Sequence, residues 1–434
     1  MSRSSARIAP LAAVFAINGA VYGSLLPRYP QLADQVGASA GEFGVALAGI
    51  GLGGVTGALV ATRVIRLVGG PVPALFATGT AFLLAAIAVA SAPSLGLLTL
   101  AFTALGLFDG FVDTAMNQAG GAMRARLGAS VMGRLHATLA AATVAATALG
   151  AATADVVPLQ LHLAVVATLL FVLLLTSLRA LRTELPSRAA DAPGDDRDVH
   201  ARSRTRPRRR TLWWAVVVGA GLAAVLVELP AQEWSALLLS RELSATSFVA
   251  GLGPLVAVAG VLVGRLSLDH AVNAFGWRIV IRAAGIVTSV GLVAGLGVSA
   301  ATETVLPLLV GLGVSAVGAG VAVPLLFDRS THLAVRVGLA PESGPGLVSG
   351  TFRIGVLVSP LLIGGVAEIA GLFVALALAA VAGAVSLPTG TEVREMAASN
   401  RIEAAVFRTS VTRGKVRQHS EQDWSRAGRQ PRRR

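Results

Sequence analysis

Long apolar stretches separated by short polar segments run along most of the chain. A helix needs about 20 mostly apolar residues to cross the hydrocarbon core of a bilayer. Twelve stretches approach or exceed that length, so we predict an all-α membrane protein with twelve transmembrane helices. In chain order, they cover residues 8–26, 43–65, 72–90, 95–119, 133–156, 159–178, 212–239, 248–268, 279–300, 305–327, 346–367 and 372–387.

Two polar segments set the predicted domain organisation. Residues 182–211 separate the first six stretches from the last six, and residues 389–434 end the chain. We therefore predict one six-helix bundle over residues 1–181 and a second over residues 212–388. A basic linker joins them, and a basic, disordered tail follows. The first apolar stretch is too long for a cleavable signal peptide, so we count it as a span.

Basic residues are distributed unevenly around these spans. When the twelve spans alternate in direction, every Lys and Arg except Arg28, Arg241 and Arg353 falls on the same side. Basic residues concentrate in the cytoplasmic segments of membrane proteins. We therefore predict a multi-pass protein of a bacterial cytoplasmic membrane, with both termini, the linker and the tail in the cytoplasm.

The composition agrees with a membrane protein and excludes several kinds of site. Charged residues make up 14% of the chain, whereas a soluble protein is about one quarter charged. The 49 glycines are typical of close helix contacts in a bilayer. Because there is no cysteine, the chain has no disulfide, no Cys-based zinc site and no cysteine nucleophile. Its single lysine, Lys415, lies in no Walker motif, so this chain alone does not drive transport with ATP.

The net charge of +13 raises the question of a nucleic-acid partner. In a soluble protein, arginine runs such as residues 202–210 and 431–434 would favour nucleic-acid binding. Beside membrane spans, such runs more often set topology and contact anionic lipid. We therefore expect membrane lipid as a partner, and no nucleic acid.

Two segments of the chain repeat each other at an offset of 207 residues, one after the second apolar stretch and one after the eighth. Both begin with Gly-x-Leu and carry a second glycine twelve residues after the first. Duplicated halves are typical of membrane transporters. The residues of interest in the two segments are Gly57, Arg63, Gly69, Gly264, Arg265, Asp269 and Gly276.

These two segments resemble the loop that the major facilitator superfamily repeats in each half, Gly-x-Leu-x-x-x-Asp-Arg-x-Gly in many members. The first segment departs from the pattern, because Thr62 stands where the second has Asp269. Within the superfamily, the chain is similar to the fucose-permease-related branch at residues 113–117 (Asp-Thr-Ala-Met-Asn), 132–136 and 233–236.

The resemblance implies the major facilitator fold, in which two pseudo-symmetric six-helix bundles rock to expose a central cavity alternately to each side. It implies a secondary active transporter without a cofactor or metal, and the repeated loops would act in gating. We expect a monomer.

The fourth stretch carries three polar residues on one helical face, because Asp109, Asp113 and Asn117 follow each other at intervals of four. By resemblance, Asp113 takes part in proton coupling and solute binding; the alternative is a structural carboxylate paired with another helix. The first stretch adds Asn18 and Tyr22, which suit solute binding. The branch's sugar permeases have a second acid in this stretch, where this chain has glycine.

A charged side chain inside a membrane needs a partner, and Arg353 lies within the eleventh stretch. Its partner is Asp113, Asp109, Glu228 or an acidic solute, unless it reaches the membrane surface.

The seventh stretch carries Glu228 and Gln232 on one face, beside Pro230. We interpret this region as part of the solute site. Trp234 either stacks on the solute or anchors the helix at the membrane interface. His136 either relays protons or forms a hydrogen bond with Asn117 or a backbone carbonyl.

The predicted function is transport of a small solute, with protons as a coupling ion. The branch favours a sugar-like solute, whereas Arg353 favours an organic anion. A multidrug or metabolite efflux antiporter is the alternative. An intramembrane enzyme would need a second aspartate-rich motif to complement Asp109 and Asp113, and the chain has none. We therefore expect no enzyme.

Overall fold

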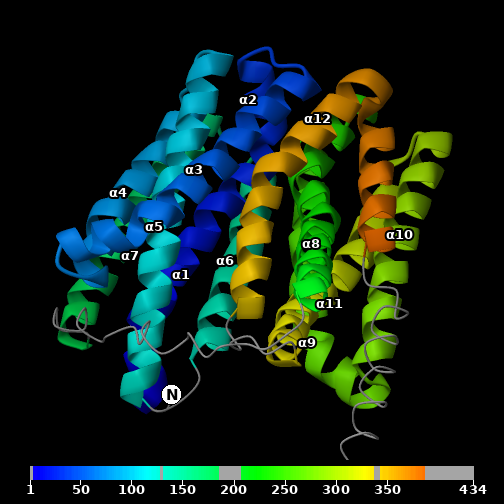
Figure 1. Ribbon diagram of the computed structural model, residues 1–434. Coiled ribbons are helices and arrows are strands. Elements are labelled where there is room, and N and C mark those ends of the chain that lie inside the picture. The colour runs from blue at the N-terminus through cyan, green and yellow to red at the C-terminus, as the bar shows by residue number, and fades with distance from the viewer. Residues whose placement is uncertain (1–2, 128–130, 185–206, 337–342, 387–434) are drawn as a thin grey trace, which may run out of the picture. The chain divides into compact units, whose positions relative to one another are not determined.

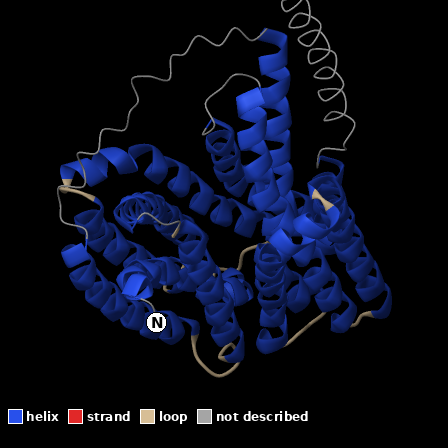
Figure 2. Cartoon of the chain, turned by 90° about the horizontal axis from the view of Figure 1, so that it is seen from below, coloured by secondary structure: helices blue, strands red, loops and turns tan. Residues whose placement is uncertain are grey.

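The computed structural model describes residues 3–127, 131–184, 207–336 and 343–386 (Figure 1). Within these residues, helices joined by turns make up the regular structure (Figure 2). The tail and most of the predicted linker lie outside the described residues.

We call residues 3–184 the first half and residues 207–386 the second half. The first half contains α1 (Arg3–Leu25), the 3-10 turn η1 (Leu26–Arg28), α2 (Tyr29–Gln35), α3 (Ala40–Leu67), α4 (Pro71–Ala90), α5 (Leu95–Leu127), α6 (Met132–Ala152) and α7 (Leu159–Glu184). The second half contains α8 (Pro207–Glu242), α9 (Ser247–Phe275), α10 (Trp277–Thr302), α11 (Val305–Arg336) and α12 (Ser343–Ser386).

Helix starts follow local capping chemistry. Ser39 accepts a hydrogen bond from the Glu42 N–H, and the Glu42 carboxylate accepts one from the Ser39 N–H, which together form a capping box at the start of α3. Thr246 caps α9 through a single hydrogen bond, which its side chain accepts from the Val249 N–H. Gly276, at φ 77°, separates α9 from α10 in a conformation that favours glycine.

Two predicted spans form one long element, α12. Its 44 residues bend at Gly371, whose φ of 83° and ψ of 161° are not helical. Within the described residues, ten helical segments are long and apolar enough to cross a membrane. They count α12 once and do not include α8, so the membrane-protein fold is confirmed and the number twelve stays a prediction.

Many large apolar side chains are exposed on the surface, among them Leu59, Leu84, Leu100, Ile286 and Leu306. A water-soluble monomer rarely exposes so much apolar surface, whereas lipid accepts it. The exposed faces therefore agree with helices embedded in a bilayer.

The two halves pack against each other through matching helices. In the first half α3 packs on α12 of the second, and α9 of the second half packs on α6 of the first. The described part of residues 1–387 belongs to one compact unit. The division into two six-helix bundles therefore stays a prediction.

One end of the molecule carries most of the turns discussed below. It contains α2, the turn between α6 and α7, the turn between α8 and α9, and the bend of α12. Figure 1 shows α2 and the bend of α12 at the end opposite the N-terminus. We call this the outer end, after the orientation that the placement of the arginines predicts.

Candidate functional site

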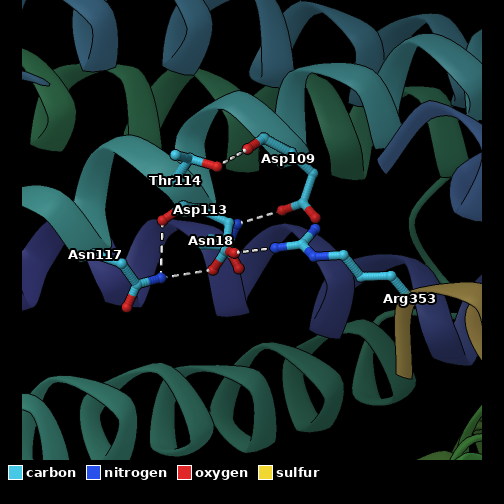
Figure 3. Close-up of polar contacts among 7 residues, drawn as sticks. Asn18, Asp109, Asp113, Thr114, Asn117 and Arg353 are labelled. Atoms are coloured by element: carbon cyan, nitrogen blue, oxygen red, sulfur yellow. Dashed lines mark hydrogen bonds and ion pairs between the residues drawn. The ribbon is translucent and has the colours of Figure 1, made fainter. Parts of the chain in front are cut away.

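A group of polar side chains joins α1, α5 and α12 (Figure 3). We call it the central polar cluster, and it consists of Asn18, Asp109, Asp113, Asn117 and Arg353. Its position is set by α5, because residues four apart lie one above the other on one helical face. The predicted polar face of the fourth stretch therefore points to neighbouring helices and not to lipid.

Arg353 pairs with Asp113. Its guanidinium NH2 lies 2.6 Å from Asp113 Oδ2, and each side chain is 31% exposed. The pair connects α12 of the second half with α5 of the first. The sequence left several partners open for Arg353, and in the structure its partner is Asp113.

Both carboxylate oxygens of Asp113 accept hydrogen bonds. Asn117 Nδ2 lies 2.9 Å from Asp113 Oδ1 and 2.8 Å from the Asp113 backbone oxygen. Because Arg353 occupies Oδ2, this arrangement suits an ionised carboxylate. A proton on Asp113 would turn an acceptor into a donor and weaken the contact with Arg353.

Asp109 has a different partner. Asn18 Nδ2 on α1 lies 2.6 Å from Asp109 Oδ1. The Tyr22 side chain lies one helical turn further along α1, within hydrogen-bonding reach of Asp109. The structure thus brings together the predicted residues of the first and fourth stretches.

A second ion pair lies within the second half. Arg265 NH2 lies 2.8 Å from Glu228 Oε1, and Glu228 is 6% exposed. Its other oxygen, Oε2, is buried without a hydrogen-bond partner. Gln232 lies one turn further along α8 and is partly buried. The pair joins α8 to α9 and assigns Arg265 a partner that sequence reasoning did not foresee.

The resemblance described the repeated segments as loops, whereas the predicted spans 43–65 and 248–268 already included their first residues; in the structure most of their length is helical. Gly57 and Arg63 lie inside α3, and Gly264, Arg265 and Asp269 lie inside α9; only Gly69 and Gly276 lie in turns. A Cβ atom on Gly57 would collide with the backbone oxygen of Leu107, and one on Gly264 with that of Val317. Both first glycines therefore serve close helix packing, and a role of these segments in gating stays a prediction.

His136 lies on α6 with its ring edge against Phe15, at a centroid distance of 5.2 Å. It lies within electrostatic reach of Asp113 in the first half and Arg265 in the second. Asn117, which the sequence left open as a partner of His136, donates its amide nitrogen to Asp113, and the role of His136 stays a prediction.

Trp234 is not an anchor at the membrane interface, because it is 0% exposed. Its ring lies 6.3 Å from that of Phe43, which in turn contacts Tyr29 and Phe102 at 5.6 and 6.3 Å. Trp234 comes from the second half and the other three rings from the first. Sequence reasoning missed this aromatic contact between the halves, since no spacing rule links the four positions.

Arg28, one of the basic residues outside the predicted cytoplasmic side, is fully buried. Its NH1 donates to the backbone oxygens of Ala154 and Val157 at 3.3 and 3.1 Å, and its NH2 to Thr153 Oγ1 at 2.9 Å. A cation at a helix C-terminus satisfies free carbonyls there. Arg28 thus fixes the end of α6. In the sequence, the only indication of this role was that Arg28 is one of three basic residues that do not fall on the predicted cytoplasmic side.

Comparisons with known proteins agree with this architecture. The sequence pattern of the family described as Major Facilitator Superfamily matches residues 11–340. The uncharacterized transporter y4wD of Sinorhizobium fredii (strain NBRC 101917 / NGR234) is 28% identical over 388 residues, which cover 84% of this chain and 95% of that protein.

Two solved structures share the fold. The nucleoside transporter NupG has a TM-score of 0.69 and 12% identity, over 88% of this chain and 97% of that one. A point mutant of the same transporter has the same TM-score and 11% identity, over 88% and 98%. At this identity, the likeness concerns the fold alone.

Proposed function

Because the chain belongs to the Major Facilitator Superfamily, we propose that this membrane transporter carries a small, uncharged polar solute by alternating access, coupled to protons. A sugar-like compound is the solute class that fits best. The contact between Asp113 and Arg353 is the observation that carries the proposal.

The charges of the central polar cluster favour an uncharged solute over an organic anion. Arg353 already has a carboxylate partner, and Asp109 adds a second acid one turn away. An anionic solute would have to take Arg353 from Asp113 and would then lie beside two carboxylates. Removing one partner of a partly buried ion pair leaves the other charge without its counterion.

The same contact supports proton coupling. Asp113 and Arg353 come from opposite halves, so the pair must break or shift when the halves move apart. A proton on Asp113 would remove the charge that holds Arg353. Proton uptake and the movement of the halves are then linked through one carboxylate. The solute would contact Asn18, Tyr22 and Gln232.

We also propose that the carrier works as a monomer in a bacterial cytoplasmic membrane, with both termini in the cytoplasm. The placement of the arginines along the sequence supports this orientation.

A solute screen on the purified protein tests the proposal. Thermal stability is measured with neutral sugars, a nucleoside, organic acids and cationic drugs, for the parent and for Asp113→Asn and Arg353→Gln. We expect a neutral sugar or the nucleoside to raise the melting temperature of the parent and to lose this effect in Asp113→Asn.

Two results would contradict this expectation. Stabilisation by an organic acid that disappears in Arg353→Gln would make the protein an anion carrier. Stabilisation by cationic drugs alone would favour an efflux antiporter.

A further inference from the structure

Two carboxylates at the outer end connect each half to the start of a helix in the other half. Glu368 on α12 accepts a hydrogen bond from the Gly41 N–H of α3 at 2.9 Å. Asp155, between α6 and α7, accepts one from the Phe248 N–H of α9 at 3.1 Å. The N–H groups in the first turn of a helix lack helical partners and carry partial positive charge. Each carboxylate therefore stabilises a helix start across the boundary between the halves.

The helix starts in these two contacts are related by the internal repeat, whereas the two carboxylates, Asp155 and Glu368, are 213 residues apart. Gly41 and Phe248 are separated by 207 residues, the offset that the sequence showed elsewhere. The residues that cap the same two helices, Ser39 and Thr246, have the same offset. The helix starts are thus equivalent positions of the two halves, and each receives a carboxylate from the other half.

A third contact lies between two positions that are equivalent to each other. Arg241 NH2 on α8 lies 3.2 Å from Asp34 Oδ1 on α2 and donates to the Ala38 backbone oxygen at 2.8 Å. Asp34 and Arg241 are also 207 residues apart. Equivalent positions of a two-fold arrangement contact each other at the axis that relates the copies. This ion pair therefore marks the axis between the halves.

The halves also approach closely at a pair of equivalent glycines. A Cβ atom on Gly44 of α3 would lie 2.5 Å from the Pro360 oxygen of α12. A Cβ atom on Gly251 of α9 would lie 2.7 Å from the Ala151 Cβ atom of α6. A methyl group does not fit between these helices, so a solute cannot pass between them in this arrangement.

We propose that Asp34, Gly41, Asp155, Arg241, Phe248 and Glu368 form a latch with matching contacts from both halves, the outer latch, which keeps the outer end closed to solute. The inference rests on the alternating access proposed above. Each contact joins opposite halves, so opening this end breaks all three together. Asp155 and Glu368 are exposed, so water replaces their lost partners and the latch can open and close reversibly.

The latch can be tested with an introduced thiol, because the chain has no cysteine. Ser359 suits this purpose, since it is 1% exposed and precedes Pro360 on the part of α12 that approaches Gly44. A membrane-impermeant maleimide is added from outside to cells that carry Ser359→Cys. We expect Asp155→Ala with Glu368→Ala to raise the labelling rate about tenfold, because two charge–helix contacts are lost.

Glu242→Ala is the matched control. Glu242 Oε1 accepts a hydrogen bond from the Leu372 N–H at 3.2 Å, at the same end but within the second half. We expect labelling of this control at the parent rate. Parent-rate labelling of the double variant, or an equal rise in the control, would overturn the proposal.

A charge exchange tests the axis contact independently of any loss of folding. Asp34→Arg places two cations together and should raise labelling, whereas Asp34→Arg with Arg241→Asp should restore the parent rate. Failure of the exchange to restore it would contradict the role of this pair. Labelling requires no solute, so a wrong solute class leaves this test unaffected.

Discussion

The outer ends of the two halves are alike, whereas their centres differ. At the outer end, α3 and α9 begin with equivalent caps, and each receives a carboxylate from the opposite half. At the centre, α5 carries two carboxylates and an amide on one face. The equivalent positions on α11, 207 residues later, are Ala316, Gly320 and Pro324.

This difference follows from what each region does in the proposed mechanism. A movement that separates the halves acts on both of them equally, so a latch stays balanced when each half contributes the same contact. A solute and a proton have no such symmetry. One half can therefore supply the acids and the other the arginine, as Asp113 and Arg353 do.

Breaking the asymmetric centre should have the largest effect. In Arg353→Gln, the Asp113 carboxylate loses its cation, and we expect the free energy of unfolding to fall by about 2 kcal/mol. If loss of the pair raises the free-energy barrier to transport by the same amount, solute uptake falls about 30-fold. Chemical unfolding in detergent and uptake into proteoliposomes measure the two effects.

A double-mutant cycle separates loss of the pair from general damage. Asp113→Asn with Arg353→Gln should recover at least half of the lost stability, because two amides replace two charges. Uptake driven by a proton gradient should stay lost. Asp328→Asn, an exposed carboxylate on α11, is the control and should match the parent. Additive losses in the double variant would mean that the pair contributes no coupling.

Changes at the equivalent glycines should affect stability to a similar extent as loss of the central pair but leave its charges intact, and the effect should be equal in both halves. Gly44→Ala and Gly251→Ala each place a methyl group against the opposite half. Overpacking of this kind costs about 1–3 kcal/mol. Separating the halves at the outer end relieves the clash, so thiol labelling at this end should rise to a similar extent in both variants.

Gly365→Ala is the control for the glycine pair, because a Cβ atom there would have no heavy atom within 4 Å. It lies on α12, close in sequence to the residues that contact α3. A strong effect of Gly44→Ala alone would show that the latch is not balanced between the halves.

Much of the fold follows from the sequence, because apolar length and arginine placement are properties of single segments. The helical membrane architecture and the family are confirmed. The polar face of α5 was also predictable, since a spacing of four residues fixes which side chains share a face. The choice of Asp113 among several partners of Arg353 depended on how α5 and α12 pack, which no local pattern contains.

The outer latch was not predicted, for a related reason. Asp155 and Glu368 accept hydrogen bonds from backbone N–H groups. Because nearly every residue has a backbone N–H, the sequence does not indicate which one a carboxylate binds. The sequence left Trp234 between stacking on the solute and anchoring at the membrane interface, but its ring is buried against Phe43. In both cases the partner belongs to the other half of the chain.

The smallest effect is expected where the two halves are chemically interchangeable. Ser39 and Thr246 accept hydrogen bonds from equivalent N–H groups. Exchanging them, as Ser39→Thr with Thr246→Ser, should change the free energy of unfolding by less than about 0.5 kcal/mol, because both residues are good caps. Replacing either residue with Ala should lower the free energy of unfolding by about 1 kcal/mol. The loss should be the same at both positions, since each cap belongs to a helix that also receives a carboxylate from the opposite half. Thermal unfolding of the three variants measures these differences. A loss at Ser39 several times that at Thr246 would mean that the capping box with Glu42, which α9 lacks at Val249, outweighs the symmetry of the outer end.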